Sequence, residues 1–246
     1  MSNLRSHVFN ICSCDRHSPQ GLSNCFKYIK EQLKGVTGKI SEQEYDYGGN
    51  KYKNLVVTFG SGDAKTVLMA HYDTCHSVGA DDNASSCAYL IEFAKTLKEQ
   101  DVEIVFNTLE EPPVFGSTKM GSYIYASSKD MRKVKLAVNF EMIGYYTEAE
   151  KWLDVGVYND KALVERAKEW LGRDFIVNDV TNERSYRDMS DHMWFFGHDV
   201  PTMIISNTGV KRNKNYHTEF DTPDTLDYKT MKRLCTKISA FLLTII

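Results

Sequence analysis

The sequence predicts one α/β domain over residues 1–246, with a central mixed, mostly parallel twisted sheet of about eight strands and helices on both faces. A length of 246 residues suits a single domain. Hydrophobic residues make up 42% of the chain against only 5 Pro and 15 Gly, so it can bury a substantial core. Short apolar segments alternate with helical ones, and strands of this kind need a sheet covered on both faces.

The first third of the chain predicts one helix and a hairpin. Residues 19–35 carry apolar side chains at a helical period, and Gly35 closes that pattern. Two strand-like segments follow at 39–47 and 51–59. The sequence Gly48-Gly49-Asn50 between them is typical of a hairpin turn.

The remaining chain alternates strands and helices. Buried strands are expected at 66–70 (TVLMA), 103–109 (EIVFNTL), 136–143 (LAVNFEMI) and 201–207 (PTMIISN), with a short strand near Phe175. Helices are expected at 84–98, 117–128, 160–171 and from Asp224 or Thr225 to Ile246. No internal repeat or linker interrupts this series, so no accessory domain is expected.

Charge and hydropathy argue against several partners. The net charge is −3 and no basic block stands out, so nucleic acid is not an expected partner. No apolar run reaches the roughly 18 residues of a membrane span, and the start lacks the features of a signal peptide. The protein is therefore expected in the cytoplasm.

The six cysteines form no C-x-x-C pair and are interpreted as free thiols. Cys75 is interpreted as a small buried thiol beside the predicted site.

Ionisable residues follow four of the predicted strands at their carboxyl ends. His71 and Asp73 follow the first apolar strand, and Glu110-Glu111 follow the second. Glu141 closes the third, and the loop after the fourth carries Tyr216-His217. Sheets of this architecture bind ligands at the carboxyl ends of their strands. Four such placements on one edge predict a functional site.

The residue types suit a pair of metal ions. Imidazole and carboxylate are good zinc ligands, and two histidines with three carboxylates can hold two ions if one carboxylate bridges them. Such a pair polarises a carbonyl and activates a water molecule. A further carboxylate, free of metal, is then needed to move the proton.

Six motifs together resemble the co-catalytic zinc aminopeptidase family, which includes glutamate carboxypeptidase and, more distantly, glutaminyl cyclase. They run in order from about residue 65 to the C-terminus: HYD at 71–73, GADDNASS at 79–86, EE at 110–111, NFEMIG at 139–144, SDH at 190–192 and YHTEFDTPDTL at 216–226. The resemblance implies a zinc exopeptidase fold and a peptide substrate with a free amino terminus. It also implies two Zn²⁺ ions, with Co²⁺ or Mn²⁺ as alternatives.

Carried over by position, the resemblance also implies a role for each site residue. The implied metal ligands are His71 and Glu141 for one ion, Glu111 and His217 for the other, and Asp82 as the bridge. Glu110 is the implied general acid/base, and Tyr216 the hydrogen-bond donor to the oxyanion. Asp73 and Asp191 are expected to support the ligands, and the Asp82–Asn83 peptide bond is expected to be cis.

Two residues depart from the family pattern. Several other polar residues can be explained by structural roles, without a part in the site. Glu141 stands where many members have Asp, and Ser86 stands where Gly is common. Asp82 or Asn83 is also a candidate cap for the helix at 84. Among the other histidines, His76, His192 and His198 are assigned to structure or surface, with substrate contact as the minor alternative for His192.

Three alternatives to a two-zinc aminopeptidase remain. A single-zinc glutaminyl cyclase-like aminoacyl transferase would share the fold, but that branch lacks an effective histidine at the position of His71. A catalytically inactive binding homologue would be expected to have lost ligands, and none is missing here. Carboxypeptidase action is compatible with the same metal centre, although this chain is too short for the accessory domains of those relatives.

Overall fold

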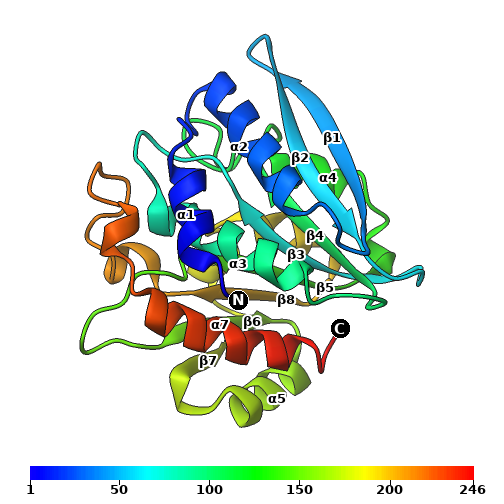
Figure 1. The fold of residues 1–246 in the computed structure, drawn as a ribbon. Coiled ribbons are helices and arrows are strands. Elements are labelled where there is room, and N and C mark those ends of the chain that lie inside the picture. Colours follow the sequence, from blue (N-terminus) through cyan, green and yellow to red (C-terminus); the bar gives the residue numbers. More distant parts are fainter.

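A computed structural model of the protein describes the backbone of residues 1–246 and every side chain except that of Val210. Its described residues form one sheet with the strand order β1-β2-β4-β3-β5-β8-β6-β7 (Figure 1). The strands are β1 (Lys39–Tyr47), β2 (Asn50–Thr58), β3 (Lys65–His71), β4 (Val102–Asn107), β5 (Val134–Glu141), β6 (Leu153–Tyr158), β7 (Phe175–Asp179) and β8 (Thr202–Ser206). The predicted fold class is confirmed.

The centre of the sheet is parallel. Strands β4, β3, β5 and β8 are neighbours in parallel pairing, so their carboxyl ends lie at one edge. The hairpin β1–β2 joins antiparallel to β4, and β6 joins antiparallel to β8, with β7 parallel to β6. The strands that carry the predicted site residues are therefore adjacent.

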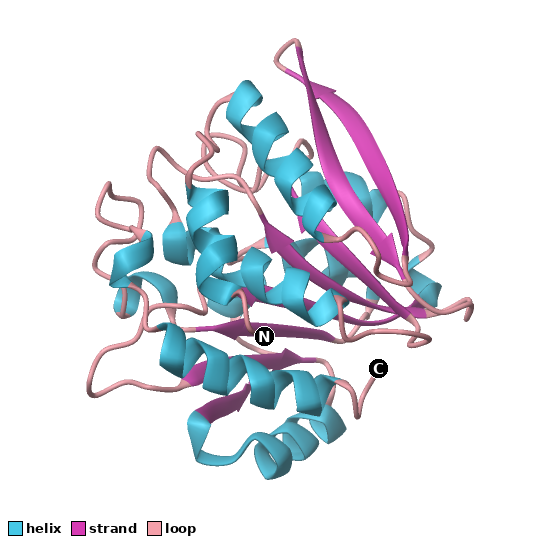
Figure 2. Cartoon of the chain, viewed as in Figure 1, coloured by secondary structure: helices cyan, strands magenta, loops and turns pink.

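Helices cover both faces of the sheet (Figure 2). They are α1 (Leu4–Cys12), α2 (Pro19–Gln32), α3 (Ser86–Ala94), α4 (Gly121–Ser127), α5 (Lys161–Leu171), α6 (Arg184–Arg187) and α7 (Tyr228–Leu242). Two further segments matter for the site: a kinked helical turn, η1 (Ala80–Ser85), and a 3₁₀ segment, η4 (Asp191–His198). Short 3₁₀ turns occur at Met131–Lys133, Gly172–Asp174, Gly209–Lys211 and Pro223–Thr225.

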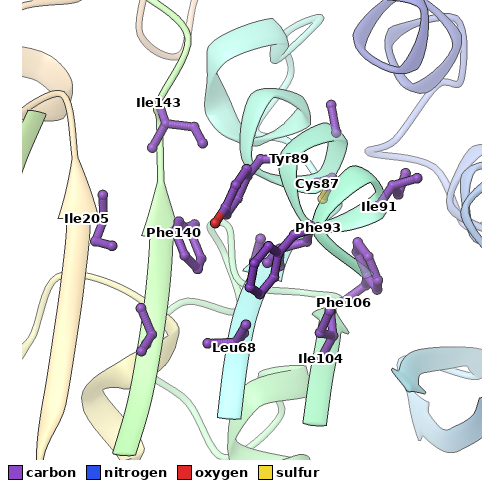
Figure 3. Close-up of a cluster of buried hydrophobic side chains, with 14 of the residues drawn as sticks. Leu68, Cys87, Tyr89, Ile91, Phe93, Ile104, Phe106, Phe140, Ile143 and Ile205 are labelled. Carbon is purple, nitrogen blue, oxygen red and sulfur yellow. The ribbon is translucent and has the colours of Figure 1, made fainter. Parts of the chain in front are cut away.

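The larger core lies between the sheet and helices α1, α2, α3, α5 and α7. All nine residues of α3 are buried, Ser86 and Glu92 included, so neighbouring elements enclose this mostly apolar helix. Figure 3 shows Tyr89 and Phe93 of α3 packed over Leu68, Phe106 and Phe140 from β3, β4 and β5. A smaller core on the opposite face lies under α4 and η4.

Several element boundaries differ from the prediction. Helix α3 begins at Ser86 and ends at Ala94, because η1 before it is kinked at Asp82 and Asn83. Helix α7 begins at Tyr228, four residues after Asp224, because the side chain of Asp227 caps it by accepting a hydrogen bond from the Thr230 amide. The predicted end of that helix at Ile246 is also wrong, since α7 ends at Leu242.

Helices α1 and α6, strand β6 and the 3₁₀ segments were not predicted from the sequence. Helix α1 packs against α3 and η1, and β6 pairs between β8 and β7. Strand β6 escaped notice because Asp154 and Gly156 interrupt its apolar pattern. None of the helices among the described residues combines the length and apolarity needed to span a bilayer.

Candidate metal centre

The parallel strands deliver acidic and imidazole side chains to one edge of the sheet. His71 is the last residue of β3 and Glu141 is the last residue of β5. Glu110 and Glu111 follow β4 after a two-residue extension, and the loop beyond β8 leads to His217. All five side chains, together with Asp82 from η1, converge within a few ångströms of one another.

His71 faces three carboxylates with one ring nitrogen. Its Nε2 lies 3.3 Å from Asp82 Oδ1, 3.4 Å from Glu141 Oε1 and 3.8 Å from Glu110 Oε2. The other ring nitrogen, Nδ1, lies 3.5 Å from Asp73 Oδ1. One side of the ring therefore faces the acidic cluster while the other side rests against a supporting carboxylate, an arrangement common for metal-binding histidines.

His217 forms a second group around the other oxygen of Asp82. Its Nε2 lies 3.2 Å from Asp82 Oδ2 and 3.0 Å from Glu111 Oε2. Asp82 thus directs one oxygen to each histidine. Each histidine in turn has a further carboxylate beside it, Glu141 for His71 and Glu111 for His217.

The donor atoms of this cluster are buried but incompletely hydrogen-bonded. Among the described residues, Glu111 Oε1, His71 Nδ1 and His217 Nε2 lack a hydrogen-bond partner of good geometry. Leaving such atoms buried and unpaired costs free energy. Four carboxylates around two neutral imidazoles also carry a charge that two divalent cations would balance. The residues therefore fit a pair of metal ions, with nitrogen and oxygen donors that suit zinc.

The pKa values of the cluster reflect its crowded charge. Burial disfavours protonation of His71, but the nearby carboxylates, Glu141 and Glu110 foremost, outweigh it and raise its pKa well above normal. Burial, followed by the charge of Asp82, raises the pKa of Glu111 to about 8. Burial also raises the pKa of Glu110 well above its usual range, although His71 opposes it. Glu110 is thus a carboxyl group suited to holding a proton.

Neighbouring side chains fix the positions of these groups. Asp73 accepts a hydrogen bond from the Glu111 amide at 3.0 Å, so it links the loops of both histidine groups. Ser190 Oγ donates to Glu141 Oε2 at 2.6 Å. Asn83 donates to the Phe140 carbonyl and accepts from the Met142 amide, so it holds the backbone on both sides of Glu141. Asn83 and Asp82 therefore do not cap the following helix, and that suggestion is wrong.

Asp81 holds three loops of the site together. It is fully buried and accepts hydrogen bonds from the Gly144 and Tyr145 amides at 2.8 and 3.0 Å. The side-chain amides of Asn207 and Asn213 donate to it at 2.7 and 3.0 Å. One carboxylate thus joins η1 to the loops that follow β5 and β8. Sequence reasoning missed this role, although the pair Asp81-Asp82 was a visible signal.

A buried arginine from the N-terminal segment holds the loop after β3. The guanidinium of Arg16 donates to the Tyr72 and Asp73 carbonyls at 3.2 and 3.4 Å, and to the Val78 and Gly79 carbonyls at 2.6 and 2.5 Å. Its side chain is almost fully buried. The N-terminal segment therefore contributes to the site, and no motif in the sequence predicted that contribution.

Strained backbone conformations gather at the ligands. Leu109, Met142 and His217 have φ values of 58°, 55° and 57°. These values lie in the left-handed region, which residues other than glycine rarely adopt. Each is a residue of the cluster or lies directly beside one, and strain of this kind concentrates at functional sites. The Asp82–Asn83 peptide bond is cis, in agreement with the expectation from the resemblance.

A cavity opens over the cluster. Its walls include Phe115, Met142, Met189 and Tyr216. The ring of Tyr216 stacks on that of His217 with 3.7 Å between centroids. A substrate entering here would meet apolar walls around a charged floor.

The other predicted residues are not among the described residues that line this cavity. Asp191 is fully buried on η4 and makes no hydrogen bond to the candidate ligands among the described residues. His192 is buried and bonds the Tyr186 carbonyl at 2.8 Å, while His76 and His198 are exposed. Cys75 is half-buried, so its interpretation as a buried thiol is wrong, and its sulfur lies within 4.8 Å of donor atoms of Glu111 and His217. All six cysteines are free thiols.

Comparison with known proteins finds a matching family model, similar sequences and similar solved structures. The model of peptidase family M28 matches residues 54–242. The chain is 34% identical over 250 residues to the uncharacterized protein YfbL of Escherichia coli (strain K12), covering 87% of this chain and 77% of that one. Among solved structures, the Fimbriiglobus ruber glutaminyl cyclase superposes with a TM-score of 0.77 at 18% identity, covering 97% of this chain and 93% of that one. The Legionella pneumophila LapA aminopeptidase gives 0.76 at 20% identity, covering 97% and 70%.

Proposed function

This chain belongs to peptidase family M28, and on that premise we propose that it is a zinc-dependent aminopeptidase that hydrolyses the first peptide bond of peptides with a free amino terminus. The proposal rests chiefly on Asp82, whose two oxygens face His71 and His217 at 3.3 and 3.2 Å. A carboxylate between two histidines, each with its own further carboxylate, suits two ions better than one.

Five residues would hold the metal. His71 and Glu141 would bind one Zn²⁺, His217 and Glu111 the other, and Asp82 both; Co²⁺ or Mn²⁺ would suit the same donors. When bound, such a pair polarises the scissile carbonyl and lowers the pKa of a water molecule. Glu141 offers a longer reach than the Asp common at its position, and Ser190 holds one of its oxygens through a hydrogen bond.

Glu110 is the carboxylate left for proton transfer. It lies 3.8 Å from His71 Nε2, further than the other carboxylates of that group, and it is buried. A carboxyl group with a raised pKa can accept a proton from the attacking water and release it to the leaving amine nitrogen. Tyr216, at the wall of the cavity, would donate a hydrogen bond to the oxyanion.

The test combines metal content with substrate turnover. We expect two zinc equivalents per chain and hydrolysis of amino-acyl p-nitroanilides that is lost on chelation and restored by zinc. The same anilides acetylated on nitrogen should be inert, because they lack the free amine. Turnover that survives complete removal of metal would refute the proposal.

A glutaminyl cyclase is the second candidate, because a structure of that class superposes over nearly the whole chain. It predicts one zinc per chain and cyclisation of amino-terminal glutamine without hydrolysis of anilides. The placement of His71 against Asp82 and Glu141 favours the two-metal alternative. An inactive homologue would bind metal and turn over neither substrate.

A further inference from the structure

A second cavity adjoins the metal centre on the side of β8 and β6. Met189, Ser206 and Thr208 line both cavities, so they form the boundary between the two. Tyr186, Ile204 and Asp154 line the second cavity but not the first. Whatever occupies the metal cavity therefore has this space beside it.

The pairing of the strands aligns Asp154 with a candidate metal ligand. Glu141 of β5 pairs with Ser206 of β8, and Ser206 pairs in turn with Asp154 of β6. Paired residues of neighbouring strands project from the same face of a sheet, and neighbouring strands lie about 4.8 Å apart. Asp154 therefore stands roughly 10 Å along the sheet from Glu141, with only the small side chain of Ser206 between them.

Asp154 is a buried carboxylate with little to balance its charge. The residue is 9% exposed and accepts one long hydrogen bond, from Asn178 Nδ2 at 3.3 Å. Among the described residues, it has no basic side chain within 4.0 Å. Asp174, by contrast, contacts both Arg233 and Lys237. A buried carboxylate without a cation is costly unless a ligand supplies one.

The two basic residues whose charges act on Asp154, Arg212 and Lys211, do not fill that role. Arg212 is buried, but its guanidinium lies 4.1 Å over the Trp152 ring and donates to the Trp152 carbonyl at 2.6 Å. Lys211 lines the cavity but is exposed, without an ion-pair partner among the described residues. Burial raises the pKa of Asp154, and Arg212 and Lys211 oppose that rise from a distance.

The walls of the cavity suit an extended aliphatic chain. Tyr186 lies against Gly156, where a Cβ atom would come within 3.0 Å of Tyr186 Cδ1 and 3.1 Å of Ile204 Cγ2. The absence of a side chain at Gly156 thus lets the aromatic ring lie close to β6 beside Asp154. Apolar side chains at Ile204 and Met189 complete walls that end at a carboxylate.

We propose that this cavity receives the side chain of the substrate's first residue and that Asp154 selects a cationic one, lysine or arginine. The inference rests on the proposed aminopeptidase function, because it needs the amino terminus to lie at the metal centre. An extended lysine side chain reaches roughly 6 Å from its Cα, given carbon–carbon bonds of about 1.5 Å. With one hydrogen bond of about 3 Å to Asp154, the side chain would span roughly 9 Å, close to the separation of roughly 10 Å between Glu141 and Asp154 along the sheet.

The test compares lysyl p-nitroanilide with norleucyl p-nitroanilide, which has the same carbon chain without the ammonium group. On the zinc-loaded protein we expect kcat/KM to favour the lysyl substrate at least tenfold, because a charge-assisted hydrogen bond forms only there. Asp154→Asn should lower the ratio of lysyl to norleucyl kcat/KM tenfold or more. Glu169→Gln, which removes one exposed acid from α5, should leave the ratio unchanged.

A binding measurement separates this inference from the proposed function. Calorimetric titration of the zinc-loaded protein with free lysine and free norleucine should give the tighter affinity for lysine, and Asp154→Asn should abolish the difference. If neither anilide is cleaved but lysine still binds more tightly through Asp154, the proposed function fails and the cavity assignment stands.

Two results would overturn the assignment. One is equal turnover and equal binding of the lysyl and norleucyl compounds by the wild-type protein, which needs no variant to fold. The other is a preference for lysine that emerges only in Lys211→Ala, because Lys211 would then be the cation that occupies the cavity.

Discussion

Asp81 and Asp82 are neighbours in the sequence and both are buried, yet their surroundings differ in kind. Asp81 accepts hydrogen bonds from four neutral N–H groups of the protein. Asp82 faces two imidazoles, in a cluster where three further carboxylates crowd the same space. The first environment is complete in the protein alone, whereas the second sets four carboxylates against two histidines and has too little positive charge to balance them.

The difference distinguishes a carboxylate that holds the fold together from one that is suited to binding metal. A buried acid that neutral donors satisfy holds loops in place and needs nothing from solution. A buried acid among other acids is stable only when cations are supplied. The comparison predicts that mutations in the two regions have opposite effects on the metal-free protein, and four experiments test how far it holds.

The largest effect is expected at the carboxylate proposed for proton transfer. Glu110→Gln should lower kcat roughly 100- to 10,000-fold while both metal ions remain bound, because the amide keeps the shape but cannot accept the proton. Metal analysis beside steady-state kinetics measures both quantities. Glu111→Gln is the matched control and should lose metal. Near-normal turnover by Glu110→Gln would assign the proton transfer to another group.

The next largest effect is expected in the framework. Asp81→Ala should reduce the free energy of unfolding of the metal-free protein by about 3 kcal/mol or more, because it leaves four buried donors without an acceptor. Urea denaturation in the presence of a chelator measures the loss. Asp63→Asn, at an exposed acid paired with Lys133, should change stability by less than about 0.5 kcal/mol. A loss as small as that of the control would remove the distinction between the two regions.

In the metal centre, we expect a mutation to increase the free energy of unfolding of the metal-free protein instead of lowering it. Glu111→Gln should stabilise the metal-free protein by about 1 kcal/mol at pH 8 to 9, because burial and Asp82 disfavour the charged carboxylate there. Thermal unfolding with and without zinc measures the change, and the order should reverse in excess zinc, where the wild type alone binds metal fully. Destabilisation of the metal-free variant would contradict the expected sign.

The smallest effect concerns a third kind of buried acid, one that the protein pairs with its own cations. Burial opposes ionisation of Glu92, but hydrogen bonds from Lys95 and His7 outweigh it and lower its pKa to about 2. A lowered pKa stabilises the fold above the usual carboxyl pKa, and that stability is lost as the pH falls towards 2. We expect a contribution of about 0.5 kcal/mol after allowance for solvent screening. The difference in unfolding free energy between wild type and Glu92→Gln, followed from pH 6 to pH 2, should shrink to zero; a constant difference would exclude the ion pair as its cause.

Much of the architecture was predictable because its cause is local in the sequence. Strands such as β3 and β5 are mostly apolar, and their last residues, His71 and Glu141, mark the edge of the sheet. Strand β6 was not predicted, because an acid and a glycine break its apolar pattern. The same two residues, Asp154 and Gly156, shape the cavity beside the metal centre. The residues that made the strand hard to predict are therefore the ones that the proposed specificity depends on.

The candidate ligands were predictable, whereas the residues that support them were not. The ligands stand in recognisable motifs at strand ends. Arg16, Asp81 and Asn83 act through contacts with residues 56 to 132 positions away, and no local pattern signals such partners. Their roles depend on which loops meet in three dimensions, and the structure supplies that information.

The buried guanidinium of Arg16 has a consequence for where the working unit begins. The family match starts at residue 54. The loop that carries Asp73 nevertheless depends on hydrogen bonds from Arg16, which lies 38 positions before the start of that match. A protein trimmed to the matched region would keep every candidate ligand and lose the cation that anchors their first loop. Sequence similarity marks the part of the chain that its relatives share, whereas the part that keeps the pocket in shape is longer.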